Sequence, residues 1–417
     1  SKIIMFFLYQ IIISIIILLS PLIILIRILK NKEDIKRFKE KFCLFSKKKV
    51  TGKLIWFHGA SVGELLSLIP IIYKLEKNTS IKQILVTTNT LSSSKVFKKY
   101  RFKKTIHQFF PIDHSFLTNK FLKYWKPHVS IFVDSEIWPS MTLALKKKNI
   151  PLILLNARIT EKSYKRWLKF NNFAKYIFSK IKIAYPQNKE TKKYLKNFNV
   201  KKLKEIGNLK LIENTKDRKD NISDNLNSQF KKYCIWTAAS THKNEETFCA
   251  NVHIQLKKRI PNLLTIIIPR HIDRVDEIIA QMQSYNLKIA THSSKLKSLN
   301  KVDIYIVDTF GETKKFFRIS NSVFMGGTIA KKGGQNPLEA ARYGSKIFHG
   351  PDIKNFPDIF RLLKNLNISK EIRSPKQLAS LISFNKKTLG GVKLKKIGRL
   401  IQEKTLKELQ PFINNEP

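Results

Sequence analysis

Short apolar runs alternate with amphipathic stretches along most of this 417-residue chain. In the first half, five apolar runs are typical of buried strands: 53–57, 84–87, 106–110, 129–133 and 152–155. Between them, apolar residues recur at helical spacing over 65–75, 94–100, 116–125 and 141–148. Strands that alternate regularly with helices predict a parallel sheet covered by helices on both faces.

A polar stretch rich in Asn, Asp and Lys, residues 212–229, interrupts this rhythm and predicts a linker or exposed loop. The alternation then resumes with strand-like runs at 233–238, 263–268, 303–307, 323–325 and 346–349, and with helical patterns at 245–259 and 392–409. We therefore predict two Rossmann-like, doubly wound α/β domains, 45–215 and 233–417, joined by a linker over 216–232. Ligands of such sheets bind beyond the carboxyl ends of the strands, so we expect the two domains to face a cleft.

The N-terminal segment predicts a membrane anchor over residues 1–28. Residues 3–26 carry no charge, and as a helix they would span roughly 36 Å, enough to cross a bilayer core. A cleavable signal peptide would have a shorter apolar region and a small-residue cleavage site. Basic residues cluster after the segment, which predicts that the rest of the chain is cytoplasmic. Ser14, Ser20 and Pro21 leave open a helix that lies in one leaflet.

The formal net charge of +49 first suggests a nucleic-acid-binding protein. However, only 14 of the 79 basic residues are Arg, and the lysines are spread along the whole chain. We therefore expect no nucleic-acid partner, although a basic membrane-tethered nucleic-acid binder stays as an alternative. So positive a surface also suits anionic lipid headgroups and acidic substrates. No protein partner is evident.

Two carboxylates follow predicted strands in the first half. Glu64 comes after strand 53–57 in His-Gly-Ala-Ser-Val-Gly-Glu, and Glu136 follows strand 129–133. The Ser-x-x-Glu spacing of Ser61 and Glu64 is that of a helix capping box, which is one interpretation of Glu64. The other is a general base at the rim of the sheet. Arg158 and Lys210 also follow strands and could bind a carboxylate or phosphate.

Polar groups of the second half predict a nucleotide site. Pro269 and Arg270 end a strand, and Phe310, Gly311 and Glu312 follow another. Glycine pairs at 326–327 and 333–334 precede a helix that the segment Asn336, Pro337, Leu338, Glu339 should open. Such a helix start could hold a phosphate, and Glu339 could accept hydrogen bonds from ribose hydroxyls.

Several motifs are absent from the sequence. It contains no G-x-x-x-x-G-K-[ST] loop, and no G-x-G-x-x-G follows the first strand of either half, which argues against an ATPase and a dehydrogenase. The three cysteines are far apart and share no metal-ligand spacing. No Asp-x-Asp-like motif stands out, so we expect a reaction that needs neither metal nor cofactor.

Taken together, these segments resemble the 3-deoxy-D-manno-octulosonic acid (Kdo) transferases of lipopolysaccharide assembly. The resemblance extends from the N-terminal segment to about residue 360. It rests on WFHGASVGE (56–64), PIDHS (111–115), DSEIWPS (134–140), PLILLNARIT (151–160), GNLK (207–210), AASTHKNEE (238–246), IIPRHIDR (267–274), FGE (310–312) and GGQNPLEAA (333–341).

The resemblance implies a GT-B fold, CMP-Kdo as donor and the lipid A precursor (lipid IVA) as acceptor at the bacterial inner membrane. It implies that Glu64 deprotonates the acceptor hydroxyl and that Glu136 and Lys210 stabilise the transition state. It also implies that three segments contact CMP: 269–270, 310–312 and 336–339. A GT-B enzyme that uses another nucleotide sugar is an alternative, beside the basic membrane-tethered nucleic-acid binder.

Overall fold

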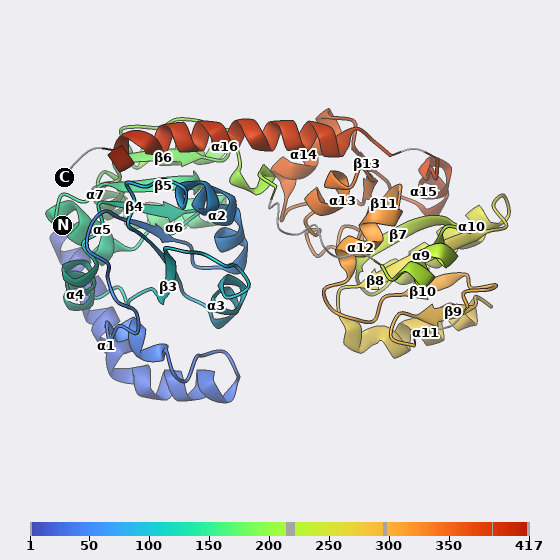
Figure 1. The fold of residues 1–417 in the computed structure, drawn as a ribbon, viewed down its shortest axis with the longest axis horizontal. Coiled ribbons are helices and arrows are strands. Elements are labelled where there is room, and N and C mark those ends of the chain that lie inside the picture. The colour runs from blue at the N-terminus through green and yellow to red at the C-terminus, as the bar shows by residue number, and fades with distance from the viewer. Residues whose placement is uncertain (1, 214–221, 295–297, 386, 415–417) are drawn as a thin grey trace. The chain divides into compact units, whose positions relative to one another are not determined.

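The computed structural model describes residues 2–213, 222–294, 298–385 and 387–414. The chain forms two units, Ser1–Thr215 with Gly398–Pro417, and Lys216–Ile397 (Figure 1). Each unit is built on its own parallel sheet, so the predicted pair of doubly wound α/β halves is confirmed.

The first unit contains a parallel sheet of six described strands in the order β3-β2-β1-β4-β5-β6. The strands are β1 Leu54–His58, β2 Gln83–Thr88, β3 Thr105–Phe109, β4 Val129–Val133, β5 Leu152–Ala157 and β6 Ile183–Pro186. Their residues are almost all buried, as expected for a sheet that helices cover on both faces. The strand order reverses between β1 and β4, so the carboxyl ends of these two strands flank the point where such folds bind ligands.

The helices of the first unit are α2 Val62–Leu75, α3 Leu91–Phe97, α4 Ser115–Trp125, α5 Pro139–Lys147, α6 Glu161–Leu168, α7 Asn171–Phe178 and α8 Lys189–Asn197. Several begin up to three residues before the predicted patterns, because capping residues extend a helix beyond its apolar face. Ser61 caps α2 and Thr90 caps α3, while Pro139 occupies the first turn of α5.

The second unit contains a parallel sheet of seven described strands in the order β13-β12-β11-β7-β8-β10-β9. They are β7 Cys234–Thr241, β8 Leu263–Pro269, β9 Ile289–Thr291, β10 Ile304–Ile306, β11 Ser322–Met325, β12 Lys346–His349 and β13 Ser369–Glu371. The order reverses between β7 and β11, so the loops after these two strands flank the switch point of this sheet.

The helices of the second unit include α9 Asp224–Phe230, α10 Glu245–Lys257, α11 Val275–Ser284, α12 Thr313–Ile319, α13 Leu338–Arg342, α14 Pro357–Asn365 and α15 Pro375–Leu381. Helix α9 corrects the predicted linker 216–232, of which residues 216–221 lie outside the described residues. Phe230 is buried against Tyr305 and Phe316, with ring centroids 5.2 and 6.1 Å away, so this segment is part of the second core.

The C-terminal helix α16, Gly390–Asn414, corrects the predicted boundary of the second domain, because residues 398–417 belong to the first unit. Ile401, Leu409 and Ile413 recur at helical spacing and are buried. A Cβ on Gly207 would lie 2.7 Å from Ile401, which shows how closely the helix packs there. The apolar side chains of α16 from residue 398 onward therefore pack in the first unit.

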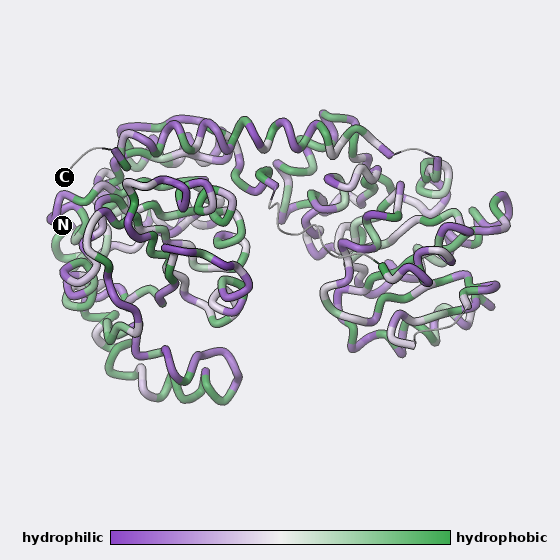
Figure 2. The backbone as a smooth tube through the Cα atoms, in the orientation of Figure 1, coloured by the Kyte–Doolittle hydropathy of each residue, from purple (hydrophilic) through white to green (hydrophobic). Residues whose placement is uncertain are grey.

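Helix α1, Lys2–Leu29, is long and apolar enough to cross a membrane, by length and composition (Figure 2). Most of its large apolar side chains are exposed, such as Phe7, Leu18 and Leu29. Its polar side chains, in contrast, contact the first unit. The Tyr9 hydroxyl donates to Asp113 at 2.7 Å, and the Gln10 amide donates to the Ser140 hydroxyl at 2.7 Å.

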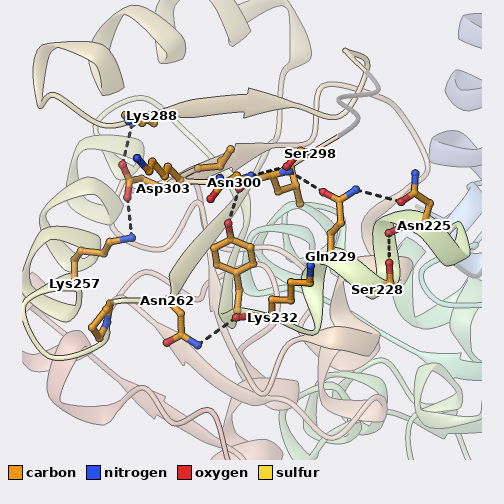
Figure 3. Close-up of a pocket in the computed structure, with 15 residues that line it drawn as sticks. Asn225, Ser228, Gln229, Lys232, Lys257, Asn262, Lys288, Ser298, Asn300 and Asp303 are labelled. Carbon is orange, nitrogen blue, oxygen red and sulfur yellow. Dashed lines mark hydrogen bonds and ion pairs between the residues drawn. The ribbon is translucent and has the colours of Figure 1, made fainter.

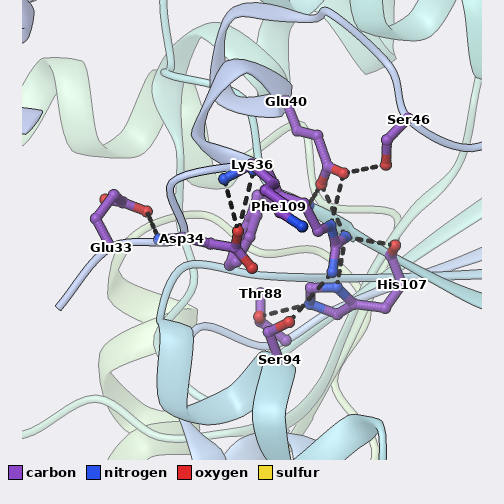
Figure 4. A network of polar contacts seen from close by, with 10 residues as sticks. Glu33, Asp34, Lys36, Glu40, Ser46, Thr88, Ser94, His107 and Phe109 are labelled. Carbon is purple, nitrogen blue, oxygen red and sulfur yellow. Dashed lines mark hydrogen bonds and ion pairs between the residues drawn. The ribbon is translucent and has the colours of Figure 1, made fainter. Parts of the chain in front are cut away.

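A buried ionic network joins the segment after α1 to the edge strand β3 (Figure 4). The Arg37 guanidinium donates two hydrogen bonds to Glu40, at 2.8 and 2.9 Å. Glu40 also accepts from the backbone N–H of Phe109 at 2.9 Å, and Arg37 donates to the His107 carbonyl at 2.9 Å. Burial, followed by the charge of Arg37, lowers the pKa of His107 to about 3. His107 is therefore neutral in this network at neutral pH.

Candidate functional site

Glu64 lies in the first turn of α2, directly beyond the carboxyl end of β1. Its carboxylate accepts the Ala60 N–H at 2.6 Å and the Ser61 hydroxyl at 2.9 Å, and the Ser61 oxygen accepts the Glu64 N–H at 3.4 Å. The predicted capping pair is thus present. Burial, together with the nearby charges of Glu136 and Asp134, raises the pKa of Glu64 to about 7.

Glu136 lies beyond the carboxyl end of β4, the strand next to β1. Its Oε2 atom is 3.1 Å from His58 Nε2 and accepts the Trp138 indole N–H at 2.8 Å. On its other side, His58 Nδ1 lies 2.9 Å from the Thr87 hydroxyl. The ring of His58 is fully buried and stacks on Phe110 at 3.9 Å. Glu136 is therefore held by two ring nitrogens at a rigid position.

Lys210 reaches the same rim. Its Nζ atom is 3.7 Å from Asp134 Oδ2, and Asp134 itself follows β4 in a left-handed backbone conformation with φ of 61°. Burial raises the pKa of Asp134, while the charges of Lys210 and Arg158 oppose this rise. The loop that carries Lys210 is fixed to β5, because the Leu209 N–H donates to the Asn156 side chain at 2.9 Å.

The three catalytic candidates of the sequence are therefore brought to one edge of one sheet. Glu64 and Glu136 follow neighbouring strands, and Lys210 is positioned there by Asn156. The sequence reasoning did not select His58 or Asp134. Both directly adjoin strands that were predicted, so their place at the strand end was the available signal.

In the second unit, Pro269 is the last residue of β8 and Arg270 follows it. The Arg270 N–H donates to the Thr241 carbonyl at 3.0 Å, which fixes the backbone of this residue against the end of β7. The Arg270 side chain is exposed. A guanidinium at this place is available to an anionic ligand.

The segment Phe310, Gly311, Glu312 connects β10 to α12. The Phe310 side chain is 77% exposed, and Gly311 has a φ of +84° with open space where a Cβ would be. Glu312 pairs with Lys315 at 2.6 Å. An exposed aromatic ring beside an unobstructed backbone is suited to contact a flat ligand.

The segment Asn336–Glu339 opens α13, with Pro337 as the N-cap residue and Leu338 as the first helical one. The Asn336 side chain accepts the Leu338 N–H at 3.1 Å, and Glu339 pairs with Lys314 at 3.3 Å. Because α13 has only 5 residues, its dipole is weaker than the predicted helix implied.

The glycine pairs at 326–327 and 333–334 lie in the segment between β11 and α13. A Cβ on Gly326 would lie 2.3 Å from the Ser240 carbonyl oxygen, and one on Gly333 would lie 2.6 Å from the Asn355 side chain. These glycines therefore permit close packing within the protein. Gly327 and Gly334 have φ of +74° and +75°, a conformation that glycine adopts without strain.

A cavity of about 980 Å³ in the second unit lies away from these residues (Figure 3). It is lined by residues that precede β7, β8, β9 and β10, among them Lys232, Asn262, Lys288 and Asp303. It thus lies at the amino ends of the strands, opposite the edge that carries Arg270. Within the described ranges, no cluster of three or more His, Cys, Asp or Glu residues has a metal-binding arrangement.

The chain thus consists of two parallel α/β units with polar groups beyond their strand ends. Among solved structures, a putative UDP-N-acetylglucosamine 2-epimerase from Listeria monocytogenes matches with a TM-score of 0.56 and 11% identity, over 88% of this chain and 98% of that one. A glycosyltransferase from Rickettsia africae matches with a TM-score of 0.53 and 12% identity, over 88% of this chain and 100% of that one. These similarities show the fold, which is of the GT-B type.

The sequence comparisons are more specific. The family model described as 3-Deoxy-D-manno-octulosonic-acid transferase (kdotransferase) matches residues 36–212. A 3-deoxy-D-manno-octulosonic acid transferase from Rickettsia bellii is 32% identical over 362 residues, which cover 87% of this chain and 86% of that protein. The chain therefore belongs to the Kdo transferase family, and it is a glycosyltransferase.

Proposed function

We propose that the protein transfers Kdo from CMP-Kdo to a sugar hydroxyl of the lipid A precursor lipid IVA, with Glu64 as the general base. The observation that carries this proposal is the position of Glu64 at the switch point of the first sheet, with a pKa of about 7. A base with a pKa near the working pH is both ionised and able to accept a proton efficiently.

In the proposed reaction, the Glu64 carboxylate takes the proton of the acceptor hydroxyl. The oxygen attacks the anomeric carbon of Kdo, and the bond from this carbon to the phosphate oxygen breaks, so that CMP leaves with the electron pair. Glu64 is protonated at the end of the step and returns its proton to solvent. No oxidant or reductant is needed.

Glu136 and Lys210 are proposed to stabilise the transition state. The hydrogen bonds from Trp138 and His58 hold Glu136 still, so its carboxylate is preorganised to face the developing positive charge on the anomeric carbon. The Lys210 ammonium, whose Nζ atom lies 3.7 Å from Asp134, would meet negative charge that develops in the transition state. Both groups are fixed before substrate binds.

The second unit is proposed to bind the CMP part of the donor. Arg270 would contact the phosphate, since a guanidinium forms two parallel hydrogen bonds to it. The exposed ring of Phe310 offers a face for the cytosine base, and Gly311 lets the backbone approach. Pro269, Glu312 and the segment from Asn336 through Pro337 and Leu338 to Glu339 complete the proposed site, with Glu339 toward the ribose.

We propose that α1 holds the enzyme on the cytoplasmic side of the inner membrane and lies in one leaflet. Tyr9, Gln10 and Ser14 contact the first unit near the helix start, and Arg27 pairs with Glu33 at 2.9 Å near its end. Because the polar side chains near the helix start are bonded to the first unit, the exposed apolar side chains face away from it. Labelling of the Lys2→Cys variant in spheroplasts with an impermeant maleimide tests whether α1 lies in one leaflet. We expect no labelling of this cysteine, and labelling would favour a spanning helix.

Transfer from CMP-Kdo to lipid IVA, followed by the mass of the product, tests the reaction. UDP-hexoses serve as controls, because a GT-B enzyme with another donor would use one of them. We expect a mass increase by one or more Kdo units with CMP-Kdo only. Transfer from a UDP-sugar and none from CMP-Kdo would overturn the proposed donor.

A further inference from the structure

Two consecutive acidic residues at the start of α10, Glu245 and Glu246, are completely buried. Glu246 forms an ion pair with Arg274 at 3.1 Å. Glu245 is not paired with a basic side chain among the residues that the structure describes. Its two carboxylate oxygens instead accept four backbone N–H groups. These belong to His242 at 2.9 Å, Gly327 at 2.7 Å, Ile329 at 3.0 Å and Ala330 at 3.1 Å.

Four donors satisfy the hydrogen-bonding capacity of an ionised carboxylate. A buried carboxylate is costly unless it is hydrogen-bonded in this way, so the arrangement depends on all four partners. A glutamine side chain cannot replace it. Its single oxygen accepts fewer bonds, and its NH₂ group would face N–H donors.

Three of the four donors belong to the loop that follows β11. This loop lies at the switch point of the second sheet, where ligands of such folds bind. Gly326 lets the loop pack directly on Ser240, the residue before the last of β7. Glu245 therefore fixes the beginning of the loop to the end of β7.

The same fixed point determines the course of the chain as far as Gly334. The Gly327 carbonyl accepts the N–H groups of Lys332 at 2.9 Å and of Gly334 at 3.1 Å. Gly333 in turn donates to Asp352 at 2.8 Å. Asn336 follows two residues after Gly334, so the start of the proposed donor segment is set by the position of Gly327.

We propose that Glu245 is a positioning residue for the donor site, which holds the loop after β11 so that Asn336–Glu339 can bind the nucleotide. Glu245 itself does not touch the donor. The proposal rests on the function proposed above, because that function assigns Asn336–Glu339 to CMP.

The test compares Glu245→Gln with the wild-type protein and with Asp303→Asn. Asp303 is the matched control, since it accepts the Lys288 N–H at 3.0 Å and pairs with Lys257 at 3.0 Å at the opposite edge of the same sheet (Figure 3). CMP binding is measured by calorimetry, KM is measured separately for CMP-Kdo and lipid IVA, and thermal unfolding reports stability.

We expect both variants to unfold at a lower temperature. Only Glu245→Gln should weaken CMP binding, by about tenfold or more, and raise KM for CMP-Kdo with KM for the acceptor unchanged. Unchanged CMP affinity in Glu245→Gln, or an equal loss in Asp303→Asn, would overturn the proposal. If the wild type does not bind CMP, the proposed function fails instead.

A second variant covers the case in which Glu245→Gln does not fold. Gly327→Ala places a side chain at a φ of +74°, with its Cβ 3.4 Å from the His242 ring. This change shifts the same loop without leaving a buried group unpaired. We expect a similar loss of CMP affinity, and normal CMP binding by a folded Gly327→Ala protein would contradict the positioning role.

Discussion

The Ser61 hydroxyl donates to the Glu64 carboxylate at 2.9 Å, while the Ser61 oxygen accepts the Glu64 N–H at 3.4 Å. This reciprocal pair caps α2 and also fixes the direction of the proposed base. The capping and catalytic interpretations of Glu64 are therefore compatible, since the cap places the carboxylate at the rim of the sheet.

Mutation of Ser61 and of Glu64 can separate the capping role of this pair from the catalytic role proposed for Glu64. Glu64→Gln retains an oxygen for the cap but has no basic carboxylate, so we expect a loss of turnover of about 10²–10⁴-fold with a near-normal unfolding temperature. Ser61→Ala serves as the comparison. It should cost about 1 kcal/mol of stability through loss of the cap, with a smaller loss of turnover. Near-normal turnover by a folded Glu64→Gln enzyme would remove Glu64 from the base role.

The pKa of Glu64 predicts the pH dependence of transfer. A base must be ionised, so kcat/KM should rise with pH up to about 7 and then level off. Glu136→Gln removes a negative charge that raises the pKa of Glu64, so the ascending limb should move to lower pH. Rates at each pH are normalised to the plateau, because Glu136→Gln also lowers the maximum rate. An unmoved limb would show that Glu136 does not influence the base.

Arg270→Ala should weaken donor binding by about tenfold or more, because a charge-assisted contact to phosphate is lost. Arg361→Ala is the control, since Arg361 is an exposed residue of α14 whose nearest acidic partner, Asp358, is 3.5 Å away. CMP affinity of both variants is measured by calorimetry. The phosphate role is contradicted when both variants bind CMP as the wild type does.

Chelation should leave transfer from CMP-Kdo unchanged, because Arg270 is proposed to meet the charge of the leaving phosphate. Initial rates with and without EDTA test this, and apoprotein with added Mg²⁺ is the reference. A rate that EDTA abolishes and Mg²⁺ restores would show a metal requirement.

Tyr9→Phe should destabilise the first unit by about 1.5–3 kcal/mol, because the buried Asp113 carboxyl loses one of its hydrogen-bond donors. Burial raises the pKa of Asp113, and its hydrogen bonds from Tyr9, Ser140 and Met141 oppose this rise. Tyr176→Phe is the control, since the Tyr176 ring contacts lysine ammonium groups through its face. Unfolding in detergent is the measurement, and equal stability of both variants would show that the contact of α1 is weak.

The sequence predicted ten of the thirteen described strands because buried parallel strands are continuously apolar, and this signal is local. It missed β6, β9 and β13. All three lie at an edge of a sheet, and the side chains of β9 and β13 are only partly buried, so no continuous apolar run is needed there. The helix α9 was also missed, because its sequence is polar and Phe230 is its one buried residue, which packs into the second core.

Glu64, Glu136 and Arg270 could be chosen from the sequence because each follows a recognisable strand. The contacts between these residues and their partners could not be predicted in the same way. His58 and Glu136 are 78 positions apart, and Glu245 is 82 positions from Gly327. Such pairs depend on which strands are adjacent, and adjacency is a property of the whole sheet.

The sequence by itself determined the two doubly wound halves, the apolar N-terminal helix and the family, because apolar periodicity and short motifs are encoded by neighbouring residues. Only the tertiary structure decided that β1 lies beside β4, so that Glu64, Asp134 and Glu136 share one rim and the pKa of Glu64 rises. It also decided that residues 398–417 join the first unit and that Glu245 secures the loop after β11. These features arise from packing and hydrogen bonds between segments that are distant in the chain.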